Sequence, residues 1–361
     1  MNAVITAQVK KNALIVAAGT GGHIFPGLAV AEGLINQGWN VVWLGTTTGM
    51  ENRIVPQRNI HFESIKFSGV RGNGLVGWLT MPFKLLKATL DSCKIIAITK
   101  PDVVVGFGGY VSLPAGLAAK LLVTKLVIHE QNSVVGLSNK ILSYVTKHVF
   151  TAFPFVIRNA VVAGNPLRAE FVNVAVPELR FQNRSGPLRI LIIGGSLGAK
   201  FLNQTVPAAI KLLAEKDRPL VTHQSGANQL DELQSLYNTL NVNATVVQFI
   251  DNTANAFADA DLIICRAGAT TVTEITAVGA AAIFVPLPSA VDDHQTKNAN
   301  YLVDQSAAWL LQQNVLTPEK LANEILNMDR NKLLKVAIAS KKLNSPNTVN
   351  TIVKVCEELT K

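Results

Sequence analysis

Two stretches of the chain repeat one order of elements: a continuous apolar run, a glycine-rich turn and a helical pattern. In the first, Asn12–Ala18 is followed by GTGGH and by a helix expected from Pro26 to Gln37. In the second, Arg189–Ile193 is followed by GGSLGAK and by a helix expected from Phe201 to Leu213. A strand that enters a helix through a glycine turn opens a doubly wound parallel sheet. Two such openings in 361 residues predict two α/β domains.

Further apolar runs after each opening have the length of buried parallel strands. They are Val41–Gly45, Val103–Phe107 and Lys125–His129 in the first half, and Leu220–Gln224, Thr245–Phe249, Leu262–Cys265 and Ala281–Val285 in the second. We therefore predict two Rossmann-like doubly wound domains, residues 1–167 and 168–343, joined near Gly164–Pro187. The default ligand site of such a fold is a cleft between the domains. A helical pattern over Thr348–Leu359, within residues 344–361, is expected to pack back on the first domain.

The positive charge of the chain is confined to its first half. Residues 1–167 hold 15 Lys and Arg against 6 Asp and Glu, whereas residues 168–361 hold 18 of each kind, so the first half carries the whole formal net charge of +9. Such asymmetry indicates an anionic partner for that half, such as nucleic acid, phospholipid headgroups or a phosphorylated acceptor. No nucleic-acid-binding motif accompanies the charge, so we expect no nucleic-acid partner.

The three cysteines, Cys93, Cys265 and Cys356, lie far apart and form no CxxC pair. This spacing argues against a disulfide framework or a zinc site and is typical of a reducing compartment. The apolar run Ala13–Ala18 is too short for a signal peptide, and Gly and Pro interrupt the longest uncharged stretches. We therefore expect a cytoplasmic protein without a membrane span.

Neither glycine turn fits the common nucleotide motifs. The first has Ile24 where a dinucleotide fingerprint has its last glycine, and the second has Ala199 and Phe201 where a Walker A loop has Gly and Ser or Thr. A glycine turn at a strand end nevertheless directs backbone N–H groups and a helix N-terminus at phosphate. The two turns predict diphosphate binding outside the NAD and ATP classes, while tight strand–helix packing alone remains the alternative.

A transfer reaction that releases a diphosphate needs a base and a means to stabilise the leaving group. His23, in the GTGGH turn, is the candidate base because imidazole accepts a proton near neutral pH. It could instead bind phosphate or cap the helix. Glu130 is the second candidate base, or an orienting carboxylate. The helix-start amides near Ser196, with Arg168 as a cation, could stabilise the leaving group without a metal.

One tripeptide has the spelling of a metal-binding Asp-x-Asp motif. Asp259-Ala260-Asp261 lies directly before the buried run LIIC, so we interpret it as a helix end that enters a strand. No metal or other cofactor is predicted.

Several motifs occur together in one order along the chain. They are GTGGHIFPGLAVAEGL, GFGGYVSLPAGLAA, HEQN, GNPLR, IIGGSLGAKFLN, FIDN and CRAGATTVTEI, between about Asn12 and Asn300. In this combination the chain resembles the MurG family, the family 28 N-acetylglucosaminyltransferases of peptidoglycan synthesis. The resemblance implies a GT-B fold and an inverting, metal-free transfer of GlcNAc from UDP-GlcNAc. The implied acceptor is undecaprenyl-diphospho-MurNAc-pentapeptide, used at the inner face of the bacterial cytoplasmic membrane, and other cell-wall and division proteins are implied as possible partners.

The resemblance also implies roles for individual residues. Glu274 would hold the ribose hydroxyls, Ile250 would bind uracil through its backbone, and Gln295 would bind the sugar hydroxyls. The diphosphate would be lined by Ala269, Thr270, Thr271, Val272 and Thr273. Contacts to the donor sugar and the acceptor would come from Thr20, Gly21, Gly22 and Asn132.

Membrane contact is predicted for the stretch Lys66–Lys100. Leu75, Val76, Trp78 and Leu79 accompany a glycine-rich loop, and Lys84, Lys87 and Lys94 follow on the next helix. Tryptophan favours the membrane interface, and basic residues are attracted to anionic headgroups. An amphipathic helix packed on the sheet is the alternative.

Three alternatives to this function remain open. Two are enzymes of the same fold, a glycolipid-forming UDP-sugar transferase and a UDP-GlcNAc 2-epimerase. The third is a non-catalytic subunit that docks on the membrane. Dependence of activity on a lipid acceptor separates the transferases from the epimerase, and release of UDP excludes the non-catalytic subunit.

Overall fold

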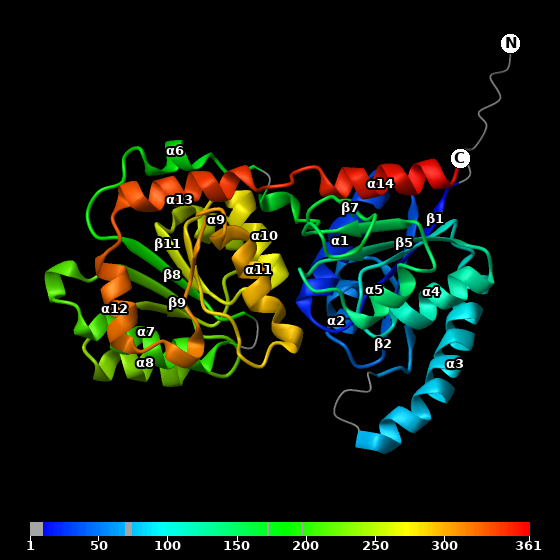
Figure 1. The fold of residues 1–361 in the computed structure, drawn as a ribbon, viewed down its shortest axis with the longest axis horizontal. Helices are drawn as coiled ribbons and strands as arrows, with labels where there is room; N and C mark the ends of the chain where they lie inside the picture. Colours follow the sequence, from blue (N-terminus) through cyan, green and yellow to red (C-terminus); the bar gives the residue numbers. More distant parts are fainter. Residues whose placement is uncertain (1–9, 69–73, 172, 196–197) are drawn as a thin grey trace, which may run out of the picture. The chain divides into compact units, whose positions relative to one another are not determined.

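The computed structural model describes residues 10–68, 74–171, 173–195 and 198–361, without the side chains of 74–78. The chain forms two compact units (Figure 1). Unit 1 comprises Met1–Arg168 and Asn347–Lys361, and unit 2 comprises Ala169–Pro346. Each unit is built on its own parallel sheet, which confirms the predicted α/β class with two doubly wound sheets.

Unit 1 contains a seven-stranded sheet in the order β3-β2-β1-β4-β5-β6-β7, and all pairs are parallel. Its strands are β1 (Asn12–Val16), β2 (Asn40–Thr46), β3 (His61–Ile65), β4 (Val103–Gly106), β5 (Lys125–Glu130), β6 (His148–Thr151) and β7 (Val161–Val162). Its helices are α1 (Gly21–Asn36), α2 (Glu51–Ile54), α3 (Gly74–Thr99), α4 (Ser112–Leu121), α5 (Leu137–Leu142) and α14 (Thr348–Leu359), with one 3₁₀ turn at Pro56–Arg58.

The alternation of side chains along β1 explains how both faces of this sheet are covered. Ala13 and Ile15 pack in a core with α1 and α14, whereas Leu14 and Val16 pack in a second core with α3 and α4. Because successive residues of a strand point to opposite faces, a strand covered on both sides must be apolar throughout. The apolar run ALIV, residues 13–16, meets this requirement.

Unit 2 contains a six-stranded parallel sheet in the order β10-β9-β8-β11-β12-β13. Its strands are β8 (Arg189–Ile193), β9 (Leu220–Gln224), β10 (Thr245–Val247), β11 (Leu262–Cys265), β12 (Ala282–Phe284) and β13 (Trp309–Leu310). Its helices are α6 (Pro177–Phe181), α7 (Lys200–Leu212), α8 (Leu230–Thr239), α9 (Thr253–Asp259), α10 (Ala269–Val278), α11 (His294–Val303), α12 (Pro318–Leu326) and α13 (Arg330–Lys342). Short 3₁₀ turns lie at Ala169–Phe171, Glu215–Asp217, Val291–Asp293 and Gln313–Val315.

The strand predictions are confirmed in position for the long apolar runs. β8, β9 and β11 have the predicted bounds, and the other predicted strands differ from the observed ones by one or two residues at an end. The prediction omitted β3, β6, β7 and β13. β3, β7 and β13 are edge strands of their sheets, where short or partly polar sequences suffice because burial is incomplete. β6 lies between β5 and β7 and is largely buried, but it is only four residues long.

The predicted start of the first helix is wrong. α1 begins at Gly21, not Pro26, and Pro26 lies inside it. Proline is favoured in the first turn of a helix, which is why the sequence suggested a start there. Because proline has no backbone N–H, Pro26 cannot donate a hydrogen bond to the Gly22 carbonyl, so α1 lacks one hydrogen bond near its N-terminus. The earlier start moves Gly21, Gly22 and His23 into the first turn.

The C-terminal helix α14 has the predicted bounds, Thr348–Leu359, and packs on α1 within unit 1. Gly33 permits the contact, because a Cβ there would lie 2.7 Å from Val349 Cγ1. Thr348 Oγ1 also donates a hydrogen bond to the Ala163 carbonyl at 2.6 Å. None of the described helices combines the length and the apolar composition needed to span a bilayer.

Candidate functional site

Each sheet has a switch point, where consecutive connections leave the sheet in opposite directions. In unit 1 it lies between β1 and β4, and in unit 2 between β8 and β11. Ligands of doubly wound sheets bind beyond the carboxyl ends of the strands at such points. The first glycine turn follows β1 and the second follows β8, so the topology brings each turn to the switch point of its own unit.

The first glycine turn is held by a close approach of two backbone segments. Gly109, after β4, has φ +79°, and a Cβ there would collide with the Ala18 carbonyl oxygen. Thr20 precedes α1 in an extended conformation, and its carbonyl accepts the N–H groups of His23 at 3.1 Å and Ile24 at 3.3 Å. The N–H groups at the start of α1 are thus directed beyond the carboxyl ends of the strands, where they can bind an anion.

His23 lies in the first turn of α1, with its ring against Gly108. Its Nδ1 lies 3.0 Å from the side-chain oxygen Oε1 of Gln131, and Gln131 Nε2 donates to the His129 carbonyl at 3.3 Å. Because an amide oxygen only accepts, this arrangement assigns the proton of neutral His23 to Nδ1. Nε2 is then the nitrogen that can take a proton from a substrate.

Gln131 belongs to the HEQN motif, but the sequence predicts no role for it. It orients His23 in the way that a hydrogen-bond partner commonly orients a catalytic imidazole. The only sequence signal for it was its place in a polar tetrapeptide directly after a buried strand.

Glu130 ends β5 and is 2% exposed. Its Oε1 accepts the Asn132 N–H at 3.1 Å, and its Oε2 accepts the Gly136 N–H and Asn139 Nδ2, each at 3.0 Å. Both oxygens therefore fold the segment 131–136 over the end of the strand. This geometry favours the orienting role over the base role, because both oxygens of the carboxylate already accept hydrogen bonds.

Arg168 is the last residue of the GNPLR motif and of the first segment of unit 1. Its guanidinium lies 5.4 Å from the centroid of the Phe25 ring, which belongs to α1. The same ring lies 2.9 Å from the position that a Cβ on Gly21 would take. Unit 1 thus holds Arg168, Thr20, Gly21, Gly22, His23 and Asn132 around the ends of β1, β4 and β5.

The second glycine turn lies over a buried polar network. Ser196 is outside the described residues, but Gly198 has φ +76°, and a Cβ there would collide with the Ser225 carbonyl oxygen. Asn203 Nδ2 donates to that carbonyl at 3.0 Å, and Asn203 Oδ1 lies 3.1 Å from His223 Nε2. His223 Nδ1 in turn lies 2.8 Å from the Tyr237 hydroxyl.

α10 is the next element after β11. It contains the residues predicted to contact the diphosphate, Ala269 to Thr273, and Glu274, which is predicted to hold the ribose. Gly268 precedes it in an extended conformation, so the N–H groups of Ala269, Thr270 and Thr271 begin the helix. Thr270 Oγ1 is buried and has no hydrogen-bond partner among the described residues. Glu274 is 8% exposed, and its charge contributes to raising the pKa of the Cys265 thiol, after burial of that thiol.

Two cations hold the other end of α10. Arg180 Nη2 donates to the Val278 carbonyl at 3.0 Å, and Lys341 Nζ donates to the Ala277 carbonyl. Burial, followed by the charge of Arg184, lowers the pKa of Arg180 to about 10. Cations at a helix C-terminus stabilise the helix dipole. α6 and α13 therefore anchor the helix that presents Glu274.

Ile250 and Gln295 lie at two other connections of unit 2. Ile250 is partly buried between β10 and α9, and Gln295 is in the first turn of α11. The side-chain Oε1 of Gln295 accepts the Leu287 N–H at 2.9 Å, which ties α11 to the segment after β12. Arg266, not predicted from the sequence, holds the same segment, because its Nη1 donates to the carbonyls of Val285 at 2.9 Å and Pro286 at 3.1 Å.

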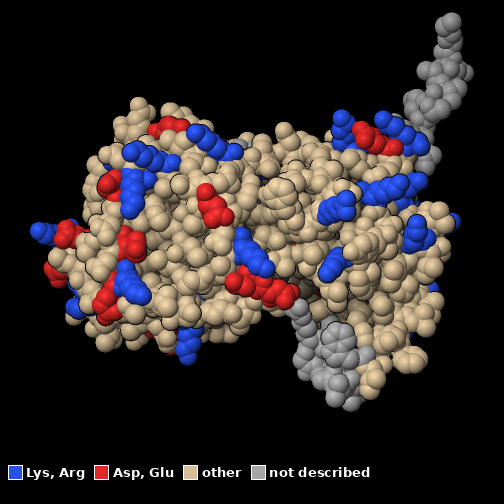
Figure 2. All heavy atoms as spheres, viewed as in Figure 1, with Lys and Arg blue, Asp and Glu red and all other residues tan. Residues whose placement is uncertain are grey.

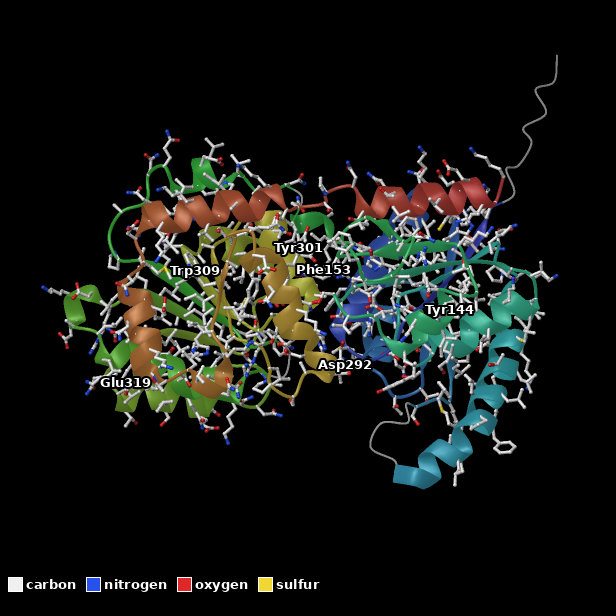
Figure 3. The ribbon with its side chains drawn as sticks, in the orientation of Figure 1. Tyr144, Phe153, Asp292, Tyr301, Trp309 and Glu319 are labelled. Carbon is white, nitrogen blue, oxygen red and sulfur yellow. The ribbon has the colours of Figure 1, made fainter. Side chains whose placement is uncertain are left out.

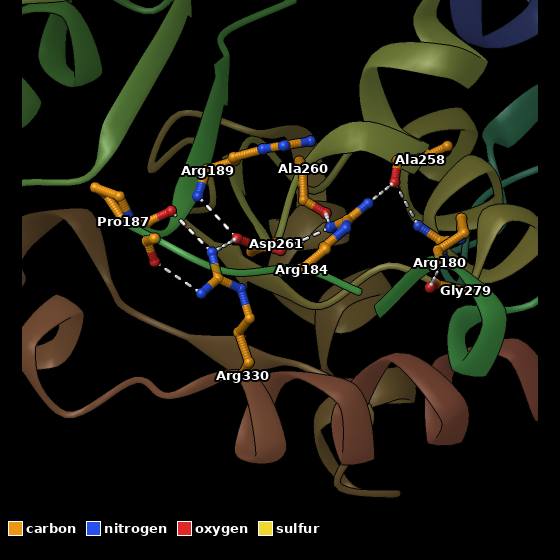
Figure 4. Close-up of polar contacts among 10 residues, drawn as sticks. Arg180, Arg184, Pro187, Arg189, Ala258, Ala260, Asp261, Gly279 and Arg330 are labelled. Atoms are coloured by element: carbon orange, nitrogen blue, oxygen red, sulfur yellow. Dashed lines mark hydrogen bonds and ion pairs between the residues drawn. The ribbon is translucent and has the colours of Figure 1, made fainter. Parts of the chain in front are cut away.

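The Asp-x-Asp tripeptide joins α9 to β11, as predicted. Asp261 is buried, and its carboxylate accepts Arg184 Nη1 at 2.6 Å, Arg330 Nη2 at 3.1 Å and the Arg189 N–H at 2.9 Å (Figure 4). These donors occupy the oxygens that a metal would need. The described residues contain no group of three or more His, Cys, Asp or Glu side chains that could hold a metal ion.

A large open pocket of unit 2 lies away from the switch point. Its volume is about 1030 Å³, and it is lined by residues at the amino ends of β8, β9 and β10, among them Arg189, Leu220 and Thr245. None of the predicted site residues lines it. The volume alone therefore does not locate the chemistry of this unit.

Comparison with known proteins identifies the family. The glycosyltransferase family 28 N-terminal domain matches residues 13–151, and the family 28 C-terminal domain matches residues 189–353. The chain belongs to glycosyltransferase family 28 and is a glycosyltransferase.

Similar proteins are matched over nearly their full length. A protein of Polaromonas sp. (strain JS666 / ATCC BAA-500) is 53% identical over 98% of this chain and 93% of its own length. One of Paracidovorax citrulli is 53% identical over 97% of this chain and 99% of its own. Both are named UDP-N-acetylglucosamine--N-acetylmuramyl-(pentapeptide) pyrophosphoryl-undecaprenol N-acetylglucosamine transferase.

A solved structure agrees with these relatives. The crystal structure of Acinetobacter baumannii MurG matches with a TM-score of 0.84 and 44% identity, over 96% of this chain and 99% of that one. The resemblance to the MurG family and the GT-B fold class are thereby confirmed.

Two buried histidines predict how stability depends on pH. Burial lowers the pKa of His129 from 6.5 to about 4 and that of His223 to about 3. Between 6.5 and these values the unfolded chain binds more protons than the folded one. The contribution of these histidines to the free energy of unfolding is therefore fully present above about pH 6.5. It is lost on acidification, by up to about 1.4 kcal/mol per pH unit for each histidine.

Urea unfolding at several pH values between 7.5 and 5 measures this slope. His129→Gln keeps a donor for the Gly164 carbonyl, which His129 Nε2 contacts at 2.8 Å, and removes one titrating group. Its stability should therefore depend less on pH than that of the wild type. Equal slopes for the two proteins would contradict the assignment of His129.

Proposed function

We propose that this protein transfers GlcNAc from UDP-GlcNAc to undecaprenyl-diphospho-MurNAc-pentapeptide, with inversion at the sugar carbon, in peptidoglycan synthesis. The activity in the names of its full-length relatives supports both the acceptor and the donor. The main structural support for the proposed reaction is the orientation of His23. Its Nδ1 faces the side-chain oxygen of Gln131, which leaves Nε2 to accept a proton.

Unit 1 would bind the acceptor. In the proposed reaction His23 Nε2 takes the proton of the acceptor hydroxyl as the oxygen attacks the anomeric carbon of GlcNAc. The bond from that carbon to the UDP oxygen breaks, and the electron pair leaves with UDP. The N–H groups of Gly21 and Gly22 and the cation of Arg168 would hold the acceptor diphosphate, with Asn132 beside them.

Unit 2 would bind the donor. Negative charge grows on the diphosphate as UDP leaves, and the N-terminus of α10, from Ala269 to Thr273, can stabilise it without reorganisation. The second glycine turn, with Ser196, would contribute further N–H groups. Glu274 would accept both ribose hydroxyls, Ile250 would bind uracil, and Gln295 would bind the sugar. None of these steps requires a metal.

The test of the function is transfer with purified protein. Radiolabelled GlcNAc should move from UDP-GlcNAc to the lipid-linked acceptor, with release of UDP, in the presence of excess chelator. A loss of activity that Mg²⁺ or Mn²⁺ restores would contradict the metal-free mechanism. Conversion of UDP-GlcNAc without a lipid acceptor would favour a 2-epimerase, and transfer to a different lipid would favour a glycolipid synthase.

His23→Ala should lower kcat by about 10²–10⁴, the usual contribution of a general base, with little change in UDP-GlcNAc affinity. The acid limb of the pH–rate profile should disappear with the imidazole. His61→Ala serves as the control, because His61 belongs to the same unit and its side chain is 65% exposed. A variant that retains kcat and the acid limb but has a raised KM for the lipid would make His23 an anion-binding residue.

Glu274→Ala should weaken UDP binding roughly ten- to a hundredfold, because a hydrogen bond to a charged group contributes about 1.5–3 kcal/mol. Isothermal titration calorimetry with UDP measures the effect directly. Glu319→Ala, in the first turn of α12, is the matched change at the surface of the same unit. Unchanged UDP affinity in folded Glu274→Ala would remove Glu274 from the donor site.

We further propose that unit 1 binds to the anionic face of the cytoplasmic membrane. The exposed side of α3 carries Leu79, Phe83, Leu86 and Leu90, which are 53–76% exposed and lie at spacings of four, three and four residues. This spacing forms one apolar stripe along a helix. Lys84, Lys87 and Lys94 are exposed on the same helix, while the side chains of Leu75, Val76 and Trp78 lie outside the described residues.

A second stripe of exposed apolar side chains, on and just after α5, supports the proposed membrane-binding surface. Leu137 and Ile141 of α5, with Tyr144 just after it (Figure 3), are 65%, 38% and 85% exposed and are accompanied by Lys140. α4 packs against both α3 and α5. Among the charged side chains on the face of unit 1 drawn in Figure 2, most are Lys or Arg, whereas both signs of charge are well represented on unit 2. Apolar side chains among cations are the composition that an anionic bilayer surface attracts.

Changing Lys84, Lys87 and Lys94 together to Glu should reduce co-sedimentation with anionic vesicles by roughly a hundredfold, since each Lys near the surface contributes about 1 kcal/mol. Higher salt should weaken wild-type binding in the same assay. The control changes three exposed lysines of unit 2, Lys211, Lys216 and Lys335, to Glu. Equal vesicle binding by both triple variants at low salt would contradict the proposed surface.

A further inference from the structure

A buried carboxylate lies beside the first glycine turn. Glu51, the first residue of α2, is 0% exposed. Its Oε1 accepts the Thr46 N–H at 2.9 Å and the Thr46 hydroxyl at 2.6 Å, and its Oε2 accepts the Gly19 N–H at 3.3 Å. Glu51 takes part in none of the ion pairs between described residues. A buried carboxylate is costly unless hydrogen bonds compensate for the lost water.

The segment between β2 and α2 is shaped to admit this carboxylate. A Cβ on Gly45 would lie 2.6 Å from Glu51 Cγ, and a Cβ on Gly49 would overlap both carboxylate oxygens. The Gly49 N–H also donates to the Thr46 hydroxyl at 3.0 Å, which directs that hydroxyl's own proton to Glu51. Two glycines and one threonine thus form a pocket that fits a single carboxylate.

The Gly19 N–H connects this pocket to the glycine turn. Gly19 has φ +103° and directly precedes Thr20, whose carbonyl accepts the His23 N–H. On its other sides the turn is held by neutral contacts: Trp43 Nε1 donates to the Ala17 carbonyl at 3.1 Å, and Gly109 packs against the Ala18 carbonyl. Glu51 supplies a charge-assisted bond at the residue where the chain leaves β1 for α1.

We propose that Glu51 is a positioning residue, which fixes the Gly19 turn and through it the place of His23 and of the first N–H groups of α1. This inference rests on the proposed function of the turn. The carboxylate suits the role because it only accepts, and three donors converge on its two oxygens. A glutamine there must direct its NH₂ group at the N–H of Gly19 or at the donors of Thr46.

The test compares Glu51→Gln with Asp102→Asn. Asp102 Oδ2 accepts the Asn12 N–H at 2.8 Å, so Asp102→Asn makes the same carboxylate-to-amide change at the opposite end of β1. Glu51→Gln should lower kcat at least tenfold with UDP affinity unchanged, assayed well below both melting temperatures, and Asp102→Asn should retain wild-type kcat. Equal effects of the two changes on kcat would overturn the proposal.

A double mutant separates positioning from general destabilisation. If Glu51 acts through the turn, adding Glu51→Gln to His23→Ala should lower kcat by much less than it does in the wild type. An undiminished effect in that background would overturn the proposal. Normal kcat in His23→Ala alone would instead contradict the proposed base, a separate outcome.

Glu51→Asp provides a second measurement if Glu51→Gln does not fold. It keeps the charge but is one methylene too short to reach both Thr46 and Gly19, so kcat should again fall with UDP affinity unchanged. Wild-type kcat in folded Glu51→Asp would overturn the proposal.

Discussion

The site of unit 1 depends on the close approach of two backbone segments at the carboxyl ends of β1 and β4. Gly109 packs against the Ala18 carbonyl, and the ring of His23 packs against Gly108. Side chains at these glycines would hold the segments apart, because a Cβ on Gly109 has no room and its φ of +79° disfavours other residues. The parallel sheet brings both ends to one edge, and the glycines allow the turn and the imidazole to meet there.

Buried polar groups then determine the details of the site. Glu130 folds the 131–136 segment, Gln131 orients His23, and Asp261 joins Arg184, Arg189 and Arg330 below the entry to β11. Each of these groups has its hydrogen-bonding atoms engaged at known partners, which is the condition under which polar groups stabilise a core. Carboxylates that resemble catalytic or metal-binding residues in the sequence are therefore used in the structure to hold loops.

The two units share one topology but present different groups at their switch points. Both have a glycine turn after the first strand of the sheet and a second loop across the switch point. In unit 1 the turn is followed by a histidine in the first turn of α1, which is suited to proton transfer. In unit 2 the loop across the switch point opens α10, whose far end is anchored by Arg180 and Lys341, and whose N–H groups are suited to a diphosphate.

The sequence alone specified the parallel-sheet class and the position of the long strands, because a strand buried on both faces must be a continuous apolar run. It also determined the family, through motifs that are specific only in combination. It did not predict that α1 begins at Gly21, since the preference of proline for a first turn outweighed the glycine turn. Which polar side chains meet depends on the tertiary fold. Glu51 and Gly19 are 32 residues apart, and His23 and Gln131 are 108 apart. Such pairs follow from the order of strands in the sheet, which local residue patterns do not encode.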